Sequence, residues 1–236
     1  MKDTFGKALH NYWKGDHRSP YFIRRDDGYV DRGSLNDYFT KKLYPMERHI
    51  IPYAQGKILD IGCGVGRHLL YFQNRKADII GIDTSTCAIQ TCKERGCKKT
   101  KVMDIFHSQF PEASFDTLLL FGHNIGIGGN LIGVKKLLTV ARKLIKPGGV
   151  LLLTSIDVTK TKEKTHKEYH QKRLASKKYV GSVKIRIEYK ESIGDWFEWL
   201  HVEPHVLKEL GSKTGWQVKV LQHEKSGEYG AVLEAV

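Results

Sequence analysis

The sequence predicts an α/β fold in which a doubly wound, mostly parallel sheet carries helices on both faces. Two observations predict it: short apolar runs alternate with stretches of helical length from residue 57 onward, and a glycine-rich turn follows the first of these runs. Continuous apolar strands separated by helices are typical of a parallel sheet that is buried on both faces. We therefore expect one domain at residues 56–236, preceded by an N-terminal helical cover at residues 1–55.

The core of this domain is expected to alternate between strands and helices. The apolar runs that predict strands lie at residues 57–61, 78–83, 99–104, 114–121 and 150–156. The stretches that predict helices lie at residues 66–75, 85–96 and 131–145. A last helix is expected at residues 203–215, because Pro204 suits an early helical position and Gly215 lies past the end. Two further strands are expected after it, at residues 216–223 and 230–236.

The N-terminal cover is rich in aromatic side chains and polar breaks. Within it, a helix is expected over residues 34–54, with Ser34 as the capping residue at its start.

An insertion is expected at about residues 158–202, where the alternation breaks. Its first part, residues 158–178, carries eight lysines or arginines against two glutamates, and we expect a mobile, solvated connection there. Two runs with strand character follow at residues 181–190 and 194–202 and predict an antiparallel hairpin. The second run carries Trp196, Phe197 and Trp199, which alternate poorly for one face, and part of this aromatic set is expected to line a substrate cavity instead of a core.

Composition limits the classes of function. A chain of 236 residues with 40% apolar content can bury a sizeable core, and a formal net charge of +13 favours an anionic partner without choosing among nucleic acid, acidic peptide and small molecule. No run approaches the roughly 20 apolar residues that span a bilayer, and the first residues lack an apolar signal core, so we expect a soluble, cytoplasmic protein without membrane contacts. The four cysteines lack the CxxC spacing of zinc and redox sites, and no metal is expected.

The most informative stretch is ILDIGCGVGRHLLYF at residues 58–72. It combines an apolar strand, an acid, three alternate glycines and the start of a helix. Glycines let the backbone turn sharply and approach a ligand closely. A dinucleotide fingerprint would place its third glycine where this chain has Arg67, and the Gly-Lys-Ser/Thr ending of a P-loop is absent. Binding of a nucleotide diphosphate is therefore disfavoured.

Acids at the ends of the next two strands indicate recognition of a nucleoside. Asp83 lies 23 residues beyond Asp60, where a carboxylate can accept hydrogen bonds from both ribose hydroxyls. Asp104 closes the third strand, at the height expected for contact with an adenine amino group. Alternatively, Asp60 caps the glycine turn and Asp83 caps the helix that follows it.

These motifs resemble the class I S-adenosylmethionine-dependent methyltransferases. LDIGCGVGR matches the first motif of that family, GIDTS its ribose-binding acid, MDIF its adenine-proximal acid, and LIKPGGVLLLTS the helix, turn and strand after its fourth strand. The resemblance covers residues 57–156. It implies a seven-stranded, Rossmann-like methyltransferase fold with S-adenosyl-L-methionine lying across the carboxyl ends of the strands.

The resemblance also implies a set of cofactor-binding residues, in which Asp60 and the glycines lie near the methionine portion. The set is Asp60, Gly62, Cys63, Gly64, Gly66, Asp83, Thr84, Asp104, Ile105 and Gly122. For Cys63 a packing role is favoured over a nucleophilic one, because no base is identifiable beside it.

The loop FGHNIGIGGN at residues 121–130 follows the fourth strand and therefore lies at the edge where open α/β sheets bind ligands. We expect His123 to be the catalytic base, with His201 as the second candidate, and Asn124 to orient the substrate. His166 and His170 have a spacing that suits a metal, but Lys167 stands between them where a glutamate would be needed, so a solvated helix face is favoured.

Methyl transfer from a sulfonium needs the nucleophile, methyl carbon and sulfur in line, so the protein mainly orients the reactants and excludes water. We expect a small-molecule acceptor in a pocket covered by the N-terminal aromatics and the inserted hairpin. The alternatives are an RNA or peptide methyltransferase that uses the basic residues 93–101 and 158–178, and a non-catalytic cofactor-binding protein. The acceptor atom and the oligomeric state stay open.

Overall fold

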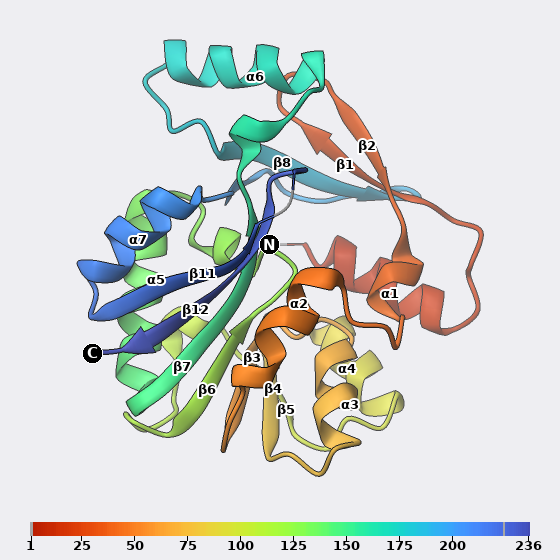
Figure 1. Ribbon diagram of the computed structural model, residues 1–236. Coiled ribbons are helices and arrows are strands. Elements are labelled where there is room, and N and C mark those ends of the chain that lie inside the picture. Colours follow the sequence, from red (N-terminus) through yellow and green to blue (C-terminus); the bar gives the residue numbers. More distant parts are fainter. Residues whose placement is uncertain (1, 224) are drawn as a thin grey trace.

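The computed structural model describes residues 2–223 and 225–236, which contain two sheets (Figure 1). The larger, sheet B, has seven strands in the order β11-β12-β7-β6-β3-β4-β5. Neighbouring strands from β7 to β5 are parallel, whereas β12 is antiparallel to both β7 and β11. Its strands are β3 (Ile58–Ile61), β4 (Ile79–Asp83), β5 (Thr100–Val102), β6 (Phe115–Leu120), β7 (Ile145–Ile156), β11 (Trp216–His223) and β12 (Glu228–Ala235). The predicted fold class is confirmed.

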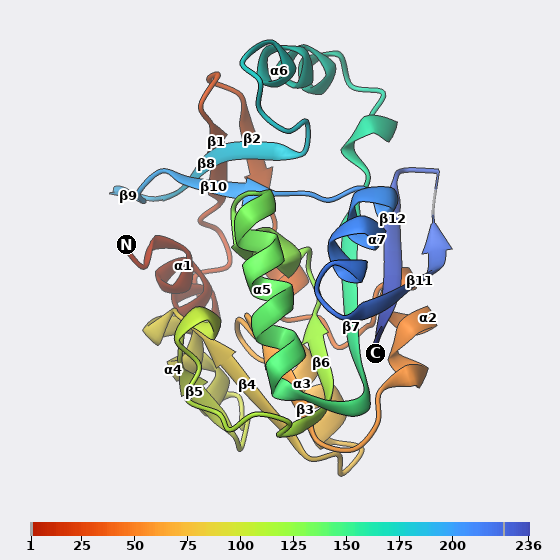
Figure 2. The ribbon, with the colours of Figure 1, turned by 90° about the vertical axis from the view of Figure 1, so that its left-hand side faces the viewer.

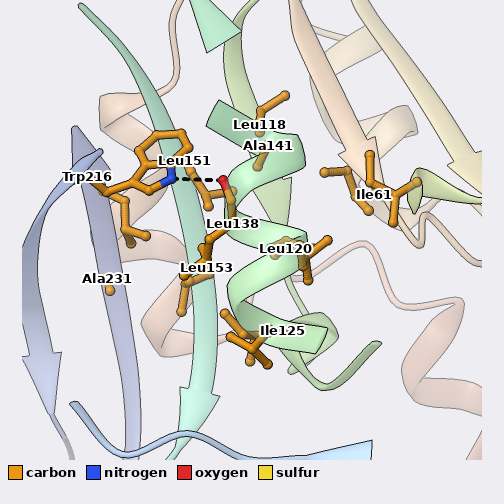
Figure 3. Close-up of a cluster of buried hydrophobic side chains, with 14 of the residues drawn as sticks. Ile61, Leu118, Leu120, Ile125, Leu138, Ala141, Leu151, Leu153, Trp216 and Ala231 are labelled. Carbon is orange, nitrogen blue, oxygen red and sulfur yellow. Dashed lines mark hydrogen bonds between the residues drawn. The ribbon is translucent and has the colours of Figure 1, made fainter. Parts of the chain in front are cut away.

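Helices cover both faces of sheet B because its central strands carry buried apolar side chains on both faces. Along β6, Leu118 and Leu120 belong to the apolar cluster under one face, while Leu119 belongs to the cluster under the other. The first cluster includes side chains of α5 (Leu131–Leu144) and α7 (Pro204–Ser212), and the second those of α2 (Pro45–Ile50), α3 (Arg67–Gln73) and α4 (Thr86–Glu94). Figure 3 shows the first cluster, in which the indole nitrogen of Trp216 donates to the carbonyl of Leu138 at 3.1 Å.

The second sheet, sheet A, joins two parts of the chain that lie far apart in sequence. Its strands are β1 (Tyr21–Arg25), β2 (Val30–Gly33), β8 (Ser182–Tyr189), β9 (Ser192–Ile193) and β10 (Phe197–Leu200). The strand order is β10-β8-β1-β2, with β9 beside β8, and Tyr21 is paired with Tyr189. Figure 2 shows β1, β8 and β10 across the end of sheet B where α5 begins.

The predicted hairpin within the insertion is present, since β8 and β10 are antiparallel neighbours. It is not an isolated hairpin, however, because β8 also pairs with β1. The strands β1 and β2 and the first helix, α1 (Thr4–Trp13), were not predicted. The N-terminal cover is therefore part helix and part strand.

The helix expected over residues 34–54 is wrong in its extent. The chain forms a short 3-10 helix at Leu35–Tyr38, then α2 at Pro45–Ile50, then a second 3-10 turn at Ile51–Tyr53. Pro45 has no N–H and disfavours helical backbone in the residue before it, so it starts a helix instead of continuing one. The side chain of Ser34 makes no capping hydrogen bond.

Residues 158–178 are not the structureless connection that their composition suggested. They contain a 3-10 turn at Val158–Lys160 and helix α6 (Lys164–Ala175). Two side chains of α6 are buried: the hydroxyl of Tyr169 donates to Asp26, and the guanidinium of Arg173 binds Glu198 of β10 at 3.0 Å. The rest of the helix is mostly exposed, which is why its sequence lacks an apolar period. None of the helices in the described residues combines the length and apolar character needed to cross a membrane.

Candidate active site

The glycine turn after β3 is held in left-handed backbone by its surroundings. Gly62, Gly64 and Gly66 have φ of +73°, +53° and +83°. A Cβ at Gly62 would lie 2.5 Å from the amide nitrogen of Asn124, and one at Gly66 would lie 2.4 Å from the sulfur of Cys97. At Gly64 a Cβ would meet nothing within 4 Å. Packing therefore explains why no side chain is present at Gly62 and Gly66, whereas Gly64 faces open space.

Asp83 connects this turn to the end of the neighbouring strand β4. Its Oδ2 accepts a hydrogen bond from the Gly64 N–H at 2.9 Å, and its Oδ1 accepts one from the Ser85 N–H at 2.8 Å. Burial raises the pKa of this carboxyl. Each carboxylate oxygen can accept more than one hydrogen bond, so Asp83 still has acceptor capacity for a ligand. Thr84, between Asp83 and Ser85, is exposed at this edge.

Asp60 lies at the end of β3 and is 1% exposed. Among the described residues its Oδ2 has no hydrogen-bond partner, and the nearest basic group is Nδ1 of His68 at 3.9 Å. Burial raises the pKa of Asp60 to about 6. A buried carboxylate oxygen without a partner costs free energy unless a ligand or a proton satisfies it.

Asp104 lies two residues beyond β5 and contacts residues that follow it closely in sequence. Its Oδ1 accepts from the Phe106 N–H at 2.9 Å, and its Oδ2 lies 3.1 Å from Nδ1 of His107. The side chain is 41% exposed, so it is accessible from solvent. Ile105 is buried in the same cluster as α5. The geometry is compatible with a helix-capping role for Asp104.

Cys63 packs beneath the glycine turn. It belongs to an apolar cluster with Cys92 and Cys97, and the thiol of Cys92 donates to the Gly64 carbonyl at 3.2 Å. A Cβ at Gly81 would lie 2.8 Å from the sulfur of Cys63. The contacts of Cys63 in this cluster are therefore packing contacts, and the Cys92 thiol adds one hydrogen bond to the turn.

The loop at residues 121–130 is hydrogen-bonded to the glycine turn and packs against sheet A. The side-chain amide of Asn124 donates to the carbonyls of Ile61 and Gly62, at 2.9 Å each. A Cβ at Gly126 would lie 2.2 Å from the ring of Trp199, so this indole packs directly on the loop. The contact of Asn124 with the backbone of the cofactor motif was not foreseen, because the spacing of the two segments in sequence does not reveal it.

The backbone at the start of the loop is strained. Gly122 and His123 both have φ of +64°, and the Gly122 N–H donates to Oγ1 of Thr154 at 3.0 Å. A left-handed residue other than glycine costs about 1 kcal/mol or more, and such residues concentrate at functional sites. A Cβ at Gly122 would meet nothing within 4 Å, as at Gly64.

The structure brings together the two histidines that the sequence offered as bases. The rings of His123 and His201 lie edge to face with centroids 5.6 Å apart. Burial lowers the pKa of His123 to about 4, and burial together with the nearby His123 and His170 lowers that of His201 to about 3. Both imidazoles are therefore neutral near pH 7, and a neutral imidazole can accept a proton. Nδ1 of His201 is buried and has no hydrogen-bond partner in the described part of the chain.

Of the remaining candidates, Trp196 and His166 make contacts outside this pair, whereas His170 is close enough to lower the pKa of His201. Trp196 is 39% exposed and stacks with the guanidinium of Arg186. His166 packs against the ring of Tyr29. Across residues 2–223 and 225–236, no group of three or more His, Cys, Asp or Glu side chains is arranged to hold a metal ion.

Comparisons with known proteins identify what this chain is similar to. Residues 53–209 match the family model described as a methyltransferase domain. An S-adenosylmethionine-dependent methyltransferase from Bacteroides fragilis, solved with S-adenosyl-L-homocysteine, is 25% identical in sequence with a TM-score of 0.87. The match covers 100% of this chain and 95% of the Bacteroides fragilis protein. A comparison with curated proteins gives no match.

More distant structures share the fold. The CcbJ methyltransferase from Streptomyces caelestis is 11% identical with a TM-score of 0.64, covering 84% of this chain and 92% of its own. CalS10, an amino pentose methyltransferase from Micromonospora echinaspora, is 14% identical with a TM-score of 0.55, covering 81% of this chain and 88% of its own.

Proposed function

The chain belongs to the class I S-adenosylmethionine-dependent methyltransferases, and we propose that it methylates a small-molecule acceptor bound between the loop at residues 121–130 and sheet A. One observation carries the proposal. Sheet A lies over the loop that follows β6, with Trp199 packed on Gly126 and His201 beside His123. A site covered in this way excludes water and favours an acceptor small enough to be enclosed.

Two features of the chain fit the cofactor, S-adenosyl-L-methionine. The open space at Gly64 allows close approach to the glycine turn, and Oδ2 of Asp60, which has no hydrogen-bond partner among the described residues, can accept from a cationic group. When bound, this cofactor supplies a methyl group on a sulfonium sulfur. We propose that Asp60 and the glycine turn hold its amino acid portion and that Asp83 and Thr84 hold the ribose.

The remaining cofactor contacts are also proposals. Asp104 and Ile105 would border the adenine, with Asp104 exchanging its contact with His107 for one with the base. Gly122 would border the transferred group, because the absence of a Cβ leaves room there. Cys63 would act only by supporting the turn.

For the acceptor, we propose that His123 accepts its proton or anchors it. The side chain is neutral near pH 7, so it can accept a hydrogen bond from an acceptor N–H or O–H. Asn124 acts as a positioning residue in this scheme, because its amide holds the loop against the carbonyls of Ile61 and Gly62. We also propose that residues 1–55 and the insertion at about 158–202 together form the cover of the methyltransferase domain at residues 56–236, since their strands share sheet A.

The test of His123 is a pair of alanine variants. His123→Ala should keep the affinity for S-adenosyl-L-homocysteine within a few-fold and lower turnover by roughly 10²–10⁴, the usual range for a lost acid or base. His205→Ala, at an exposed position on α7, is the matched control and should leave both unchanged. If His123→Ala lowers only the melting temperature, with turnover per folded molecule near wild type, His123 is not catalytic.

The RNA or peptide alternative is favoured by the cluster of exposed lysines at α6. We expect that exchanging Lys162, Lys164, Lys177 and Lys178 for Gln leaves small-molecule turnover nearly unchanged. Methyl transfer from labelled cofactor to nucleic acid, protein and small-molecule fractions of a cell extract identifies the acceptor class. Stoichiometric, site-specific RNA methylation that collapses in the Gln variant would overturn the small-molecule proposal.

A further inference from the structure

A buried carboxylate in the N-terminal segment contacts the helix that follows the glycine turn. Glu47 of α2 is 2% exposed, and it accepts hydrogen bonds from the guanidinium of Arg67, from Nε2 of His68 at 3.0 Å, and from the Tyr44 N–H at 2.9 Å. Burial opposes its ionisation, but the hydrogen bonds from His68 and Arg67 outweigh burial and lower the pKa of Glu47 to about 2. Glu47 is therefore ionised at every pH at which the enzyme would be assayed.

His68 connects Glu47 to two parts of the candidate site. Its Nδ1 lies 3.9 Å from Oδ2 of Asp60, the buried oxygen for which the described part of the chain offers no hydrogen-bond partner. The same ring packs edge to face on Phe121, at 4.7 Å between centroids, and Phe121 directly precedes Gly122. One buried imidazole thus contacts an element of the N-terminal segment, the end of β3 and the start of the loop.

The charge on Glu47 determines which ring nitrogen of His68 must carry a proton. An ionised carboxylate offers only acceptors, so the hydrogen bond at 3.0 Å requires a proton on Nε2 of His68. Nδ1 is then the nitrogen that faces Asp60, either as an acceptor for a proton of Asp60 or as a donor from the imidazolium.

We propose that Glu47, through His68, is a positioning residue for cofactor binding: it directs Nδ1 of His68 toward Asp60 and so sets the orientation and ionisation of the Asp60 carboxylate. Glu47 precedes the residues that match the methyltransferase domain model, which begin at residue 53. The N-terminal segment therefore contributes to the cofactor site of this chain without touching the cofactor. The inference rests on the place proposed above for Asp60.

Charged groups from several elements act on Asp60. Burial raises its pKa most; His68 and Arg67 of α3 lower it, whereas Asp83 at the end of β4 and Glu47 of α2 raise it. Because removing His68 removes the first of the opposing groups, the pKa of Asp60 should rise further from about 6.

The experiment uses two variants that keep hydrogen-bonding groups in place. Glu47→Gln can still accept from Arg67, but its amide would donate to Nε2 of His68 and move the ring proton to Nδ1. His68→Gln can still donate to Glu47 but presents no ring nitrogen to Asp60. Glu94→Gln is the control, because Glu94 pairs with Lys14 in a partly exposed ion pair.

Both variants should bind S-adenosyl-L-homocysteine about tenfold more weakly at pH 7, within the usual range for coupling between a remote group and a ligand. In Glu47→Gln the Nδ1–H of His68 would occupy Oδ2 of Asp60, the oxygen proposed to accept from the ligand. In His68→Gln the higher pKa of Asp60 would leave less of this carboxylate ionised.

Calorimetric titration well below the melting temperature measures this affinity on folded protein. Affinity should rise with pH as Asp60 ionises, and in His68→Gln the midpoint of this rise should lie at a higher pH than in wild type. Nitrogen NMR of the His68 ring should show a proton on Nε2 in wild type and on Nδ1 in Glu47→Gln.

A lower melting temperature with wild-type affinity and an unchanged pH midpoint would show that Glu47 and His68 are only structural, and would overturn the proposal. Failure of the cofactor site itself is a different result, since wild-type protein would then not bind S-adenosyl-L-homocysteine at all.

Discussion

Gly64→Ala tests the cofactor site most directly, because Gly64 faces open space in the structure. With φ of +53° the new residue stays in left-handed backbone, which costs an L-residue about 1–2 kcal/mol. In a chain of 236 residues, 1 kcal/mol lowers the melting temperature by roughly 2–4 °C. Apart from its two chain neighbours, the added methyl group meets no atom of the described residues within 4 Å, so no further loss of stability is expected.

The effect on ligand binding should be much larger than the effect on stability. A methyl group forced into a well-packed contact costs roughly 1–3 kcal/mol, which corresponds to a loss of affinity of about 5- to 150-fold. The assay is calorimetric titration with S-adenosyl-L-homocysteine, alongside thermal melting of the same preparation.

Gly148→Ala is the matched control. Gly148 has φ of +73° and also faces open space, but it lies at the start of β7, at the opposite end of sheet B from Gly64. It should lose similar stability and keep wild-type affinity. Equal affinity of the Gly64 and Gly148 variants would refute the reasoning, because the space at Gly64 would then not be the place of the cofactor.

Three further predictions concern neighbouring groups. Asp83→Asn replaces one carboxylate acceptor by an amide donor, so affinity for S-adenosyl-L-homocysteine should fall by about 5- to 150-fold in the same titration, and wild-type affinity would remove Asp83 from the site. The pKa values of His123 and His201 are lowered to about 4 and about 3 in the folded state, so between pH 7 and 5 these two side chains take up protons in the unfolded state but not in the folded state. The free energy of unfolding should therefore fall as the pH drops from 7 to 5, and it should fall less in a variant with Gln at both positions. Tyr229→Phe leaves the buried carbonyl of Val202 without its donor and should cost about 1–3 kcal/mol in denaturant unfolding, whereas unchanged affinity for the cofactor product is expected.

The part of the site that could be predicted from sequence is the part built by local structure. The strand, glycine turn and helix at residues 58–72 form one continuous segment, so the turn could be recognised from residues a few positions apart. Asp83 was placed for the same reason, because it ends the next strand of a parallel sheet. The side chains that pack on Gly62 and Gly66, from Asn124 and Cys97, come from distant segments and could not be recognised from the local sequence.

Contacts between distant segments could not be predicted in this way. The strands β1 and β2 are short and carry charged residues; β2 pairs with β1, and β1 pairs in turn with β8, which lies far away in sequence. Asn124 was predicted to orient substrate, yet its amide faces two backbone carbonyls of the glycine turn. Glu47 belongs to no sequence motif. The role proposed for it depends on His68, about twenty positions later in the chain, which becomes its neighbour only when α2 packs beside α3.

The construction of sheet A also has a consequence for the order in which the enzyme is assembled on the ribosome. Tyr21 pairs with Tyr189, so β1 has no partner on one side until β8 has been translated. At about 5–20 residues per second, this delay is on the order of ten seconds or more. The parallel strands of sheet B, from β3 to β7, are complete earlier. A nascent chain should therefore form the strands that carry the proposed cofactor site before sheet A, and during that interval the unpaired edge of β1 is exposed to pairing with other chains.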